Sequence, residues 1–129
     1  MHKKYIVFAA FFGAVAVALG AFGAHGLEGI TMDDKILHVF QTGVQYQMYH
    51  ALALLAVAIL FEKFPVSRMK WAANSFITGI ILFSGSLYLL TFLKIQGSNL
   101  TSYIGPVTPL GGIFFIAGWL LLLLAIIKK

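Results

Sequence analysis

The sequence predicts an all-α membrane protein: a four-helix transmembrane bundle with both termini inside and its second helix extended on the outer side. Hydrophobic residues make up 60% of the 129 residues and charged residues only 10%, and the mean hydropathy is +0.94. Soluble domains are about half apolar and about a quarter charged. A chain this short leaves much of its surface exposed. Because so many of its residues are apolar, much of that surface must be apolar too, so we infer that lipid surrounds it.

Four stretches without Asp, Glu, Lys or Arg predict the membrane spans of a single domain over residues 1–129. We place these spans at residues 5–27, 36–61, 71–93 and 108–127. Each holds an apolar run of about 20 residues, the length that crosses hydrocarbon as a helix. We expect helices because lipid offers no hydrogen-bond partner to a free backbone N–H group.

The basic residues predict the orientation. Of the nine Lys and Arg residues, only Lys35 and Lys94 fall in the first and third connections. The others lie at the two termini and in the second connection: Lys3, Lys4, Lys63, Arg68, Lys70, Lys128 and Lys129. Such an excess marks the cytoplasmic side, so we expect both termini and the second connection to be cytoplasmic. Because the charges sit at segment ends and form no patch, we expect no nucleic-acid binding.

The first residues allow a second interpretation. A basic start, an apolar stretch and the tripeptide Ala21-Phe22-Gly23 partly resemble a cleaved signal peptide. The apolar stretch is longer than a usual signal core, which favours a retained first span.

Local signals predict where two helices begin. Residues 31–34 (TMDD) resemble a capping box, so the second helix should run from about Met32 to Phe61. Such a helix is about 45 Å long and exceeds the roughly 30 Å of hydrocarbon, so its first turns should project outward. Thr108 and Pro109 resemble an N-cap and first residue of the fourth helix, after an outer loop over residues 96–108.

Small residues predict close helix packing. In lipid no hydrophobic effect drives helices together, so they associate through close packing, which small residues allow. The contacts could lie within the bundle or at an oligomer interface. The predicted helix-packing residues are Gly13, Ala16, Gly20, Gly23, Ala24, Gly79, Gly85, Gly111 and Gly112.

A polar stretch in residues 42–55 (TGVQYQMYHALALL) predicts the candidate site. At 100° per residue, a stripe from His38 to Tyr49 covers an arc of about 100° on one side of the second helix. Gln47 faces the side opposite His38, and His50 lies near the middle of the bilayer. Polar groups at this depth usually face a bundle interior, a partner or water. The candidate residues are His25, His38, Gln41, Gln45, Tyr49 and His50.

Three roles for this cluster remain open. The side chains of Gln45, Gln47, Tyr49 and His50 could form hydrogen bonds to neighbouring helices. Their partners would be Asn74, Ser84, Ser86, Tyr88 or backbone exposed at the glycines. They could line a pocket for a small molecule, an ion or a proton. They could hold a metal or haem, but His38 and His50 are about 18 Å apart along the helix. The chain also contains no Cys and no metal-ligand motif, so we expect no metal and no cofactor.

We expect no enzyme activity and no catalytic residue. No carboxylate lies inside any predicted span, so His50 or Tyr49 would lack an orienting partner for acid–base chemistry. Ser84 and Ser86 flank Gly85 within an apolar helix and are not on the sharp turn of a nucleophile elbow.

Four segments together resemble a known family: "LGAFGAHGL" (19–27), "TGVQYQMYHALALL" (42–55), "LFSGSLYLL" (82–90) and "GPVTPLGGIFFIAGW" (105–119). They are similar to the YgdD/YwdK-like family of small four-span bacterial inner-membrane proteins, which has mitochondrial relatives. The resemblance implies the fold and the membrane; the family is a domain of unknown function and has no assigned catalytic residues. His25, Gln45, Tyr49 and His50 stand at the family's motif positions.

Three classes of function follow. The first is a structural or accessory subunit, in contact with the lipid bilayer, acting through helix–helix contacts in a homo-oligomer or a larger membrane complex. The second is binding or transport of a small molecule, ion or proton through the polar face of the second helix in an oligomer. The third is a membrane enzyme or redox module. The small size, the glycine-rich faces and the lack of catalytic groups favour the first.

Overall fold

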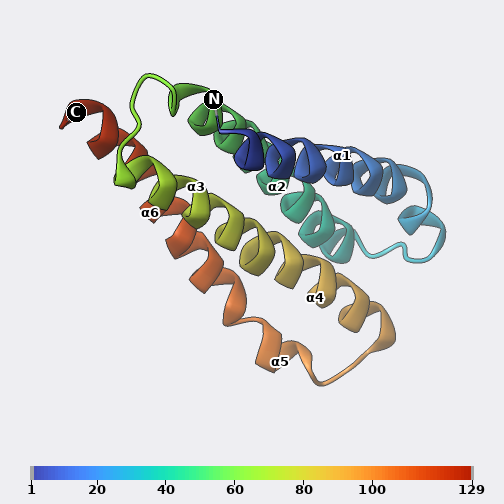
Figure 1. The fold of residues 1–129 in the computed structure, drawn as a ribbon. Helices are drawn as coiled ribbons and strands as arrows, with labels where there is room; N and C mark the ends of the chain where they lie inside the picture. Colours follow the sequence, from blue (N-terminus) through green and yellow to red (C-terminus); the bar gives the residue numbers. More distant parts are fainter. Residues whose placement is uncertain (1, 129) are drawn as a thin grey trace.

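The computed structural model describes residues 2–128, which form helices joined by short connections (Figure 1). Four apolar segments are long enough to cross a membrane: Lys3–Gly29, Asp34–Leu60, Ser67–Gln96 and Thr101–Ile127. A helix of about 27 residues is about 40 Å long, more than the roughly 30 Å of hydrocarbon. The predicted all-α, four-helix membrane fold is confirmed.

Short helical elements extend or interrupt three of these segments. One of them, η2, is a π-helical turn in the third segment. In chain order the elements are α1 (Lys3–His25), η1 (Leu27–Gly29), α2 (Asp34–Leu60), α3 (Ser67–Gly79), η2 (Ile80–Ser84), α4 (Gly85–Gln96), α5 (Thr101–Ile104) and α6 (Val107–Ile127).

The four segments form two helical hairpins that pack side by side, with the two chain ends at the same end of the bundle (Figure 1). α1 packs along α2, α6 packs along α3 and η2, and α2 joins the two pairs by packing against the third segment. Of the most apolar part of each segment, 44% is buried in the second and 50% in the third, but only 17% in the first and 22% in the fourth. The second and third segments therefore form the centre, and the first and fourth flank it.

The apolar core lies between α2 and α3, toward the end that carries the chain termini. Phe76, Leu54, Met69 and Val57 are its largest fully buried apolar side chains. The chain start is fastened to this end, because the His2 backbone N–H donates to the Ala58 carbonyl at 3.0 Å.

The predicted start of the second helix is shifted by two residues. α2 begins at Asp34, and its N-cap is Asp33, whose carboxylate accepts a hydrogen bond from the Lys35 backbone N–H at 2.9 Å. Thr31 accepts from the Asp33 N–H at 3.2 Å and so shapes the preceding turn. The reason is that Asp33 is itself a strong N-cap residue, and it replaces Thr31 in that role.

The predicted start of the fourth helix at Thr108 and Pro109 is wrong. The loop expected over residues 96–108 contains α5, and α6 begins at Val107, which places Thr108 and Pro109 in its first turn. Pro is tolerated there because the first N–H groups of a helix have no intrahelical partner. The Thr108 hydroxyl caps no helix and instead contacts Ser86.

Glycines bring α6 against the third segment. A Cβ built on Gly111 would lie 2.8 Å from Phe83 Cα, so the backbones of α6 and η2 are in direct contact there. Further along, the Phe115 ring covers Gly79, where a Cβ would lie 2.6 Å from the Cε1 atom and still closer to Cδ1. These two predicted packing residues lie where two helices approach most closely.

The other predicted packing residues lie in less crowded places. A Cβ on Gly23 would meet the Phe40 ring at 2.9 Å, whereas Cβ atoms on Gly20 and Gly112 would make ordinary contacts at 3.4 and 3.9 Å. Ala16 is buried and Ala24 is exposed. Among the described residues, no atom lies within 4 Å of a Cβ built on Gly13 or Gly85.

We predict that Gly111→Ala lowers the free energy of unfolding by about 1–3 kcal/mol, because the new methyl group would press on the Phe83 backbone, which cannot turn aside. Unfolding by heat or denaturant in detergent micelles measures the change. Gly112→Ala is the matched control, because its methyl group would lie 3.9 Å from the nearest side chain. Equal losses at the two neighbouring glycines would contradict this reading of the contact.

Candidate functional site

The centre of the bundle contains a carboxamide that joins three helices. Gln47 on α2 is 2% exposed. Its Nε2 group donates to the Phe12 carbonyl of α1 at 2.8 Å, and its Oε1 atom accepts from the Tyr88 hydroxyl of α4 at 2.6 Å. Both ends of the amide are therefore used, which is what a polar group needs in an interior without water.

Two buried serines add further links. Ser84, in the π-helical turn, donates to the Gly43 carbonyl of α2 at 2.7 Å. Ser86 donates to the Phe83 carbonyl at 2.9 Å, and its oxygen lies 2.5 Å from that of Thr108 on α6. Because a hydroxyl has one proton to donate, Thr108 must be the donor to Ser86. The third segment is thus bonded to both α2 and α6.

His50 on α2 is buried against α6, and both of its ring nitrogens form hydrogen bonds. The Trp119 indole N–H of α6 donates to Nε2 at 3.1 Å, and Nδ1 lies 2.7 Å from the Tyr46 carbonyl. Since a carbonyl only accepts, the proton sits on Nδ1 and the lone pair on Nε2. The ring also stacks on Phe115, with centroids 3.5 Å apart. His50 is therefore held in one tautomer by its neighbours.

The structure separates the residues that the sequence grouped. His50 is buried, whereas His25 lies exposed at the end of α1. Along α2, the stripe predicted to meet neighbouring helices lies on the exposed side of this chain: His38, Gln41, Gln45 and Tyr49. Gln47, on the opposite side of α2 from that stripe, faces inward together with His50.

One signal in the sequence could have found the inward side. Gln47, His50, Leu54 and Val57 follow one another at spacings of three or four, so they share one side of a helix. All four are buried. Tracing this side back from the apolar end of α2 selects Gln47 and His50. No such signal marks Trp119 as the partner of His50.

Two glutamines on the exposed side have no partner within the part of the chain that the structure describes. Gln41 and Gln45 are exposed and form no side-chain hydrogen bond to residues 2–128. The middle of the charge-free run 36–61 lies beside Tyr49. Along the helix, Gln45 is about 5 Å and Gln41 about 11 Å from that middle. With that middle at the bilayer centre, Gln45 lies well within the roughly 30 Å of hydrocarbon, and Gln41 lies toward its outer edge.

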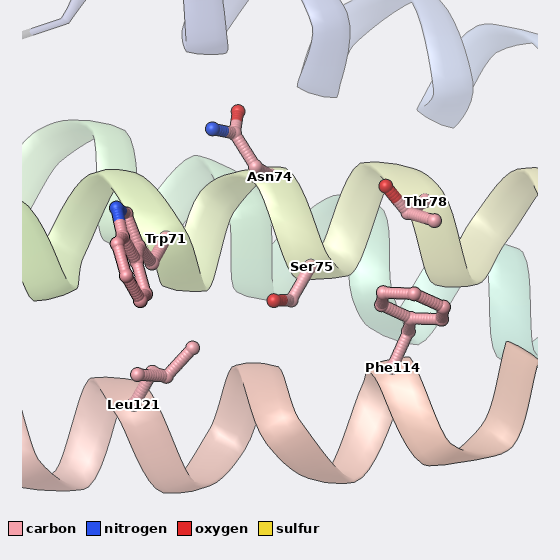
Figure 2. Close-up of a pocket in the computed structure, with 6 residues that line it drawn as sticks. All are labelled: Trp71, Asn74, Ser75, Thr78, Phe114 and Leu121. Carbon is pink, nitrogen blue, oxygen red and sulfur yellow. The ribbon is translucent and has the colours of Figure 1, made fainter.

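A shallow groove between α3 and α6 is a further feature of the surface with polar side chains. Figure 2 shows Phe114 and Leu121 reaching from α6 toward α3, and Asn74 pointing away from α6. The Asn74 Oδ1 atom accepts from the Tyr5 hydroxyl at 3.0 Å, which ties α3 to α1. Within residues 2–128, no three His, Cys, Asp or Glu side chains gather closely enough to hold a metal ion.

The chain resembles known membrane proteins along nearly its whole length. A family described as "Protein of unknown function (DUF423)" matches residues 19–112. The UPF0382 membrane protein YwdK of Bacillus subtilis is 46% identical over 127 residues, which cover 98% of each chain. This chain belongs to the UPF0382 (DUF423) family.

Further UPF0382 relatives come from distant organisms. One from Haemophilus influenzae is 43% identical over 123 residues, 93% of this chain and 90% of its own. One from Schizosaccharomyces pombe is 39% identical over 112 residues, 86% of this chain and 91% of its own. No solved structure matches the chain. The names and the four apolar segments together identify a multi-pass membrane protein of a UPF0382 family found in bacteria and in a fungus.

We predict that Gln47→Leu lowers the free energy of unfolding by about 1–3 kcal/mol, because it removes two interhelical hydrogen bonds and leaves the Tyr88 hydroxyl unpaired. Unfolding in detergent micelles measures this. Gln96→Leu at the exposed end of α4 is the matched glutamine control and should leave stability unchanged. If Tyr88→Phe costs as much in the Gln47→Leu variant as in the original chain, the two side chains are not coupled and the network is refuted.

Proposed function

We propose that this protein is a structural or accessory subunit of the membrane, which acts through helix–helix contacts with copies of itself or with a larger membrane complex. The observation that supports the proposal is the contrast between the two sides of α2. The inward polar groups Gln47 and His50 are fully hydrogen-bonded. The outward carboxamides of Gln41 and Gln45 have no partner within residues 2–128.

Lipid makes this contrast significant. A carboxamide placed in hydrocarbon without hydrogen bonds costs a few kcal/mol, roughly 2–7 depending on the reference. Polar side chains within membrane helices accordingly face other protein or a water-filled space. A second protein surface over α2 would supply the missing partners of Gln41 and Gln45.

Transport through the bundle interior has weaker support. A transport pathway needs polar groups that can exchange their partners for the substrate. In this bundle the buried groups at mid-depth, Gln47, Ser84 and His50, are already bonded to neighbouring helices. We also expect no catalysis, since the membrane-spanning runs carry no Asp or Glu to act with His50.

We further propose that the protein lies in the bacterial cell membrane with both termini in the cytoplasm. Within residues 2–128, the end of the bundle with the connection over residues 61–66 carries six of the eight basic residues, and the opposite end carries Lys35 and Lys94. That opposite end also carries the acidic residues Glu28, Asp33 and Asp34. An excess of Lys and Arg beside short connections favours the cytoplasmic side.

We predict that the protein migrates as an assembly larger than its 14.1 kDa chain when bacterial membranes are dissolved in mild detergent. Native electrophoresis and light scattering measure the protein mass, and cross-linking inside the membrane before extraction controls for loss of weak partners. A chain that stays monomeric in the membrane and in several detergents would show that the accessory role is wrong.

We predict that a membrane-impermeant maleimide labels Asn99→Cys in intact cells but labels Ser67→Cys only after the membrane is opened. Both positions are exposed and lie at opposite ends of the bundle: Asn99 is in the connection after α4, and Ser67 is the first residue of α3. The native chain contains no Cys. The reverse labelling pattern would place the termini outside.

A further inference from the structure

A surface groove runs along one side of the interface between α1 and α2. On α1, small or exposed residues line this groove, among them Gly13 and Val17, and Met48 and Leu52 line it on α2. The groove continues toward η1, where Gly20 lies opposite Gln41 and Gln45. The two parts form one surface, because Gln41, Gln45, Met48 and Leu52 repeat at spacings of four, three and four along one side of α2. We call this surface the α1–α2 groove.

The α1 wall of the groove is low. Gly13, Val17, Gly20 and Ala24 repeat at the same spacing of four, three and four, so they too share one side of a helix. A Cβ on Gly13 would meet no described atom within 4 Å. Half of the predicted small-residue face of α1 therefore packs on α2 through Ala16 and Gly23, and the other half is left open beside the two glutamines.

We propose that a second copy of this chain docks in the α1–α2 groove and forms a symmetric dimer; this rests on the proposed function and names its partner. Copies inserted in one orientation are related by a two-fold axis along the membrane normal, so residues of equal depth meet. Gln45 then faces Gln45 of the other copy, and Gln41 faces Gln41.

The chemistry of the groove favours a second copy over another partner. A carboxamide has both an acceptor oxygen and donor N–H groups, so two identical glutamines satisfy each other across a two-fold axis. No charged side chain lines this groove, so it requires no counter-charge from a different protein. The open small residues of α1 let the two copies approach closely. A lipid acyl chain could fill the groove but offers the glutamines no hydrogen bond.

The absence of native Cys allows a direct test by cross-linking in native membranes. Val17→Cys places a thiol in the groove and keeps both glutamines. Ile113→Cys is the control on α6, away from the groove; Val17 is 63% exposed and Ile113 is 61% exposed. We expect mild oxidation to give a disulfide dimer with Val17→Cys and at least tenfold less with Ile113→Cys.

Second variants show whether the groove itself makes the contact. Gln41→Leu with Gln45→Leu should reduce the Val17→Cys dimer at least tenfold, and so should Gly13→Leu, which fills the groove. Gly85→Leu is the matched glycine control, because a Cβ there also meets no described atom within 4 Å. It should leave the dimer unchanged. Unfolding in micelles checks that each variant remains folded, and only folded variants are compared.

The outcomes separate this inference from the proposed function. Equal cross-linking at Val17 and Ile113, or a dimer indifferent to the glutamines, overturns the groove dimer. A Val17→Cys product of another mass, or a monomer within a larger native assembly, overturns the dimer and leaves the accessory role intact. A chain that is monomeric in every measurement overturns both.

Discussion

The Gln47 carboxamide fixes the relative positions of three helices, α1, α2 and α4, because its hydrogen bonds join them. Its two hydrogen bonds reach α1 on one side and α4 on the other. Lipid tails are as apolar as the helix surfaces, so the hydrophobic effect does not hold the helices together. Packing and interhelical hydrogen bonds do so instead. Gly43 lets Tyr88 lie close beside α2, since a Cβ there would be 2.9 Å from its ring. The π-helical turn sets Ser84 toward the Gly43 carbonyl. Gln47, Gly43, Tyr88 and Ser84 contact one another, so a change in one of them shifts the others.

The membrane spans could be predicted because charge is excluded from hydrocarbon over a fixed length. The direction in which α2 faces could not be read from its most obvious pattern. In water, the polar side of a helix faces out; in a membrane protein, polar residues commonly face in. By that rule the stripe from His38 to Tyr49 is expected to face the neighbouring helices. Here that stripe is exposed and Gln47 is buried. Both sides of α2 contain polar and apolar residues, so the spacing that links Gln47 to Leu54 and Val57 was the better guide.

The π-helical turn and the start of α6 lay beyond sequence reasoning for a different reason. Both depend on contacts between segments distant in the chain. η2 is pressed against Gly111, and Thr108 meets Ser86 and caps no helix. The Trp119–His50 bond joins residues 69 positions apart. Local propensities contain no information on such pairs, although they placed the Asp-rich start of α2 to within two residues.

The pairing of α1 with α2, and of α3 with α6, divides the chain into two sequential hairpins. Each half is a hairpin of sequential helices with its own outer connection, and residues 61–66 join them at the end that carries the chain termini. During synthesis the first hairpin can close before the second has left the ribosome, because the packing of α1 on α2 involves no later residue. At that stage Gln47 Nε2 can already donate to the Phe12 carbonyl, whereas Gln47 Oε1 has not yet met the Tyr88 hydroxyl. Arrival of the second hairpin satisfies that oxygen, so the central bond marks completed assembly of the two halves.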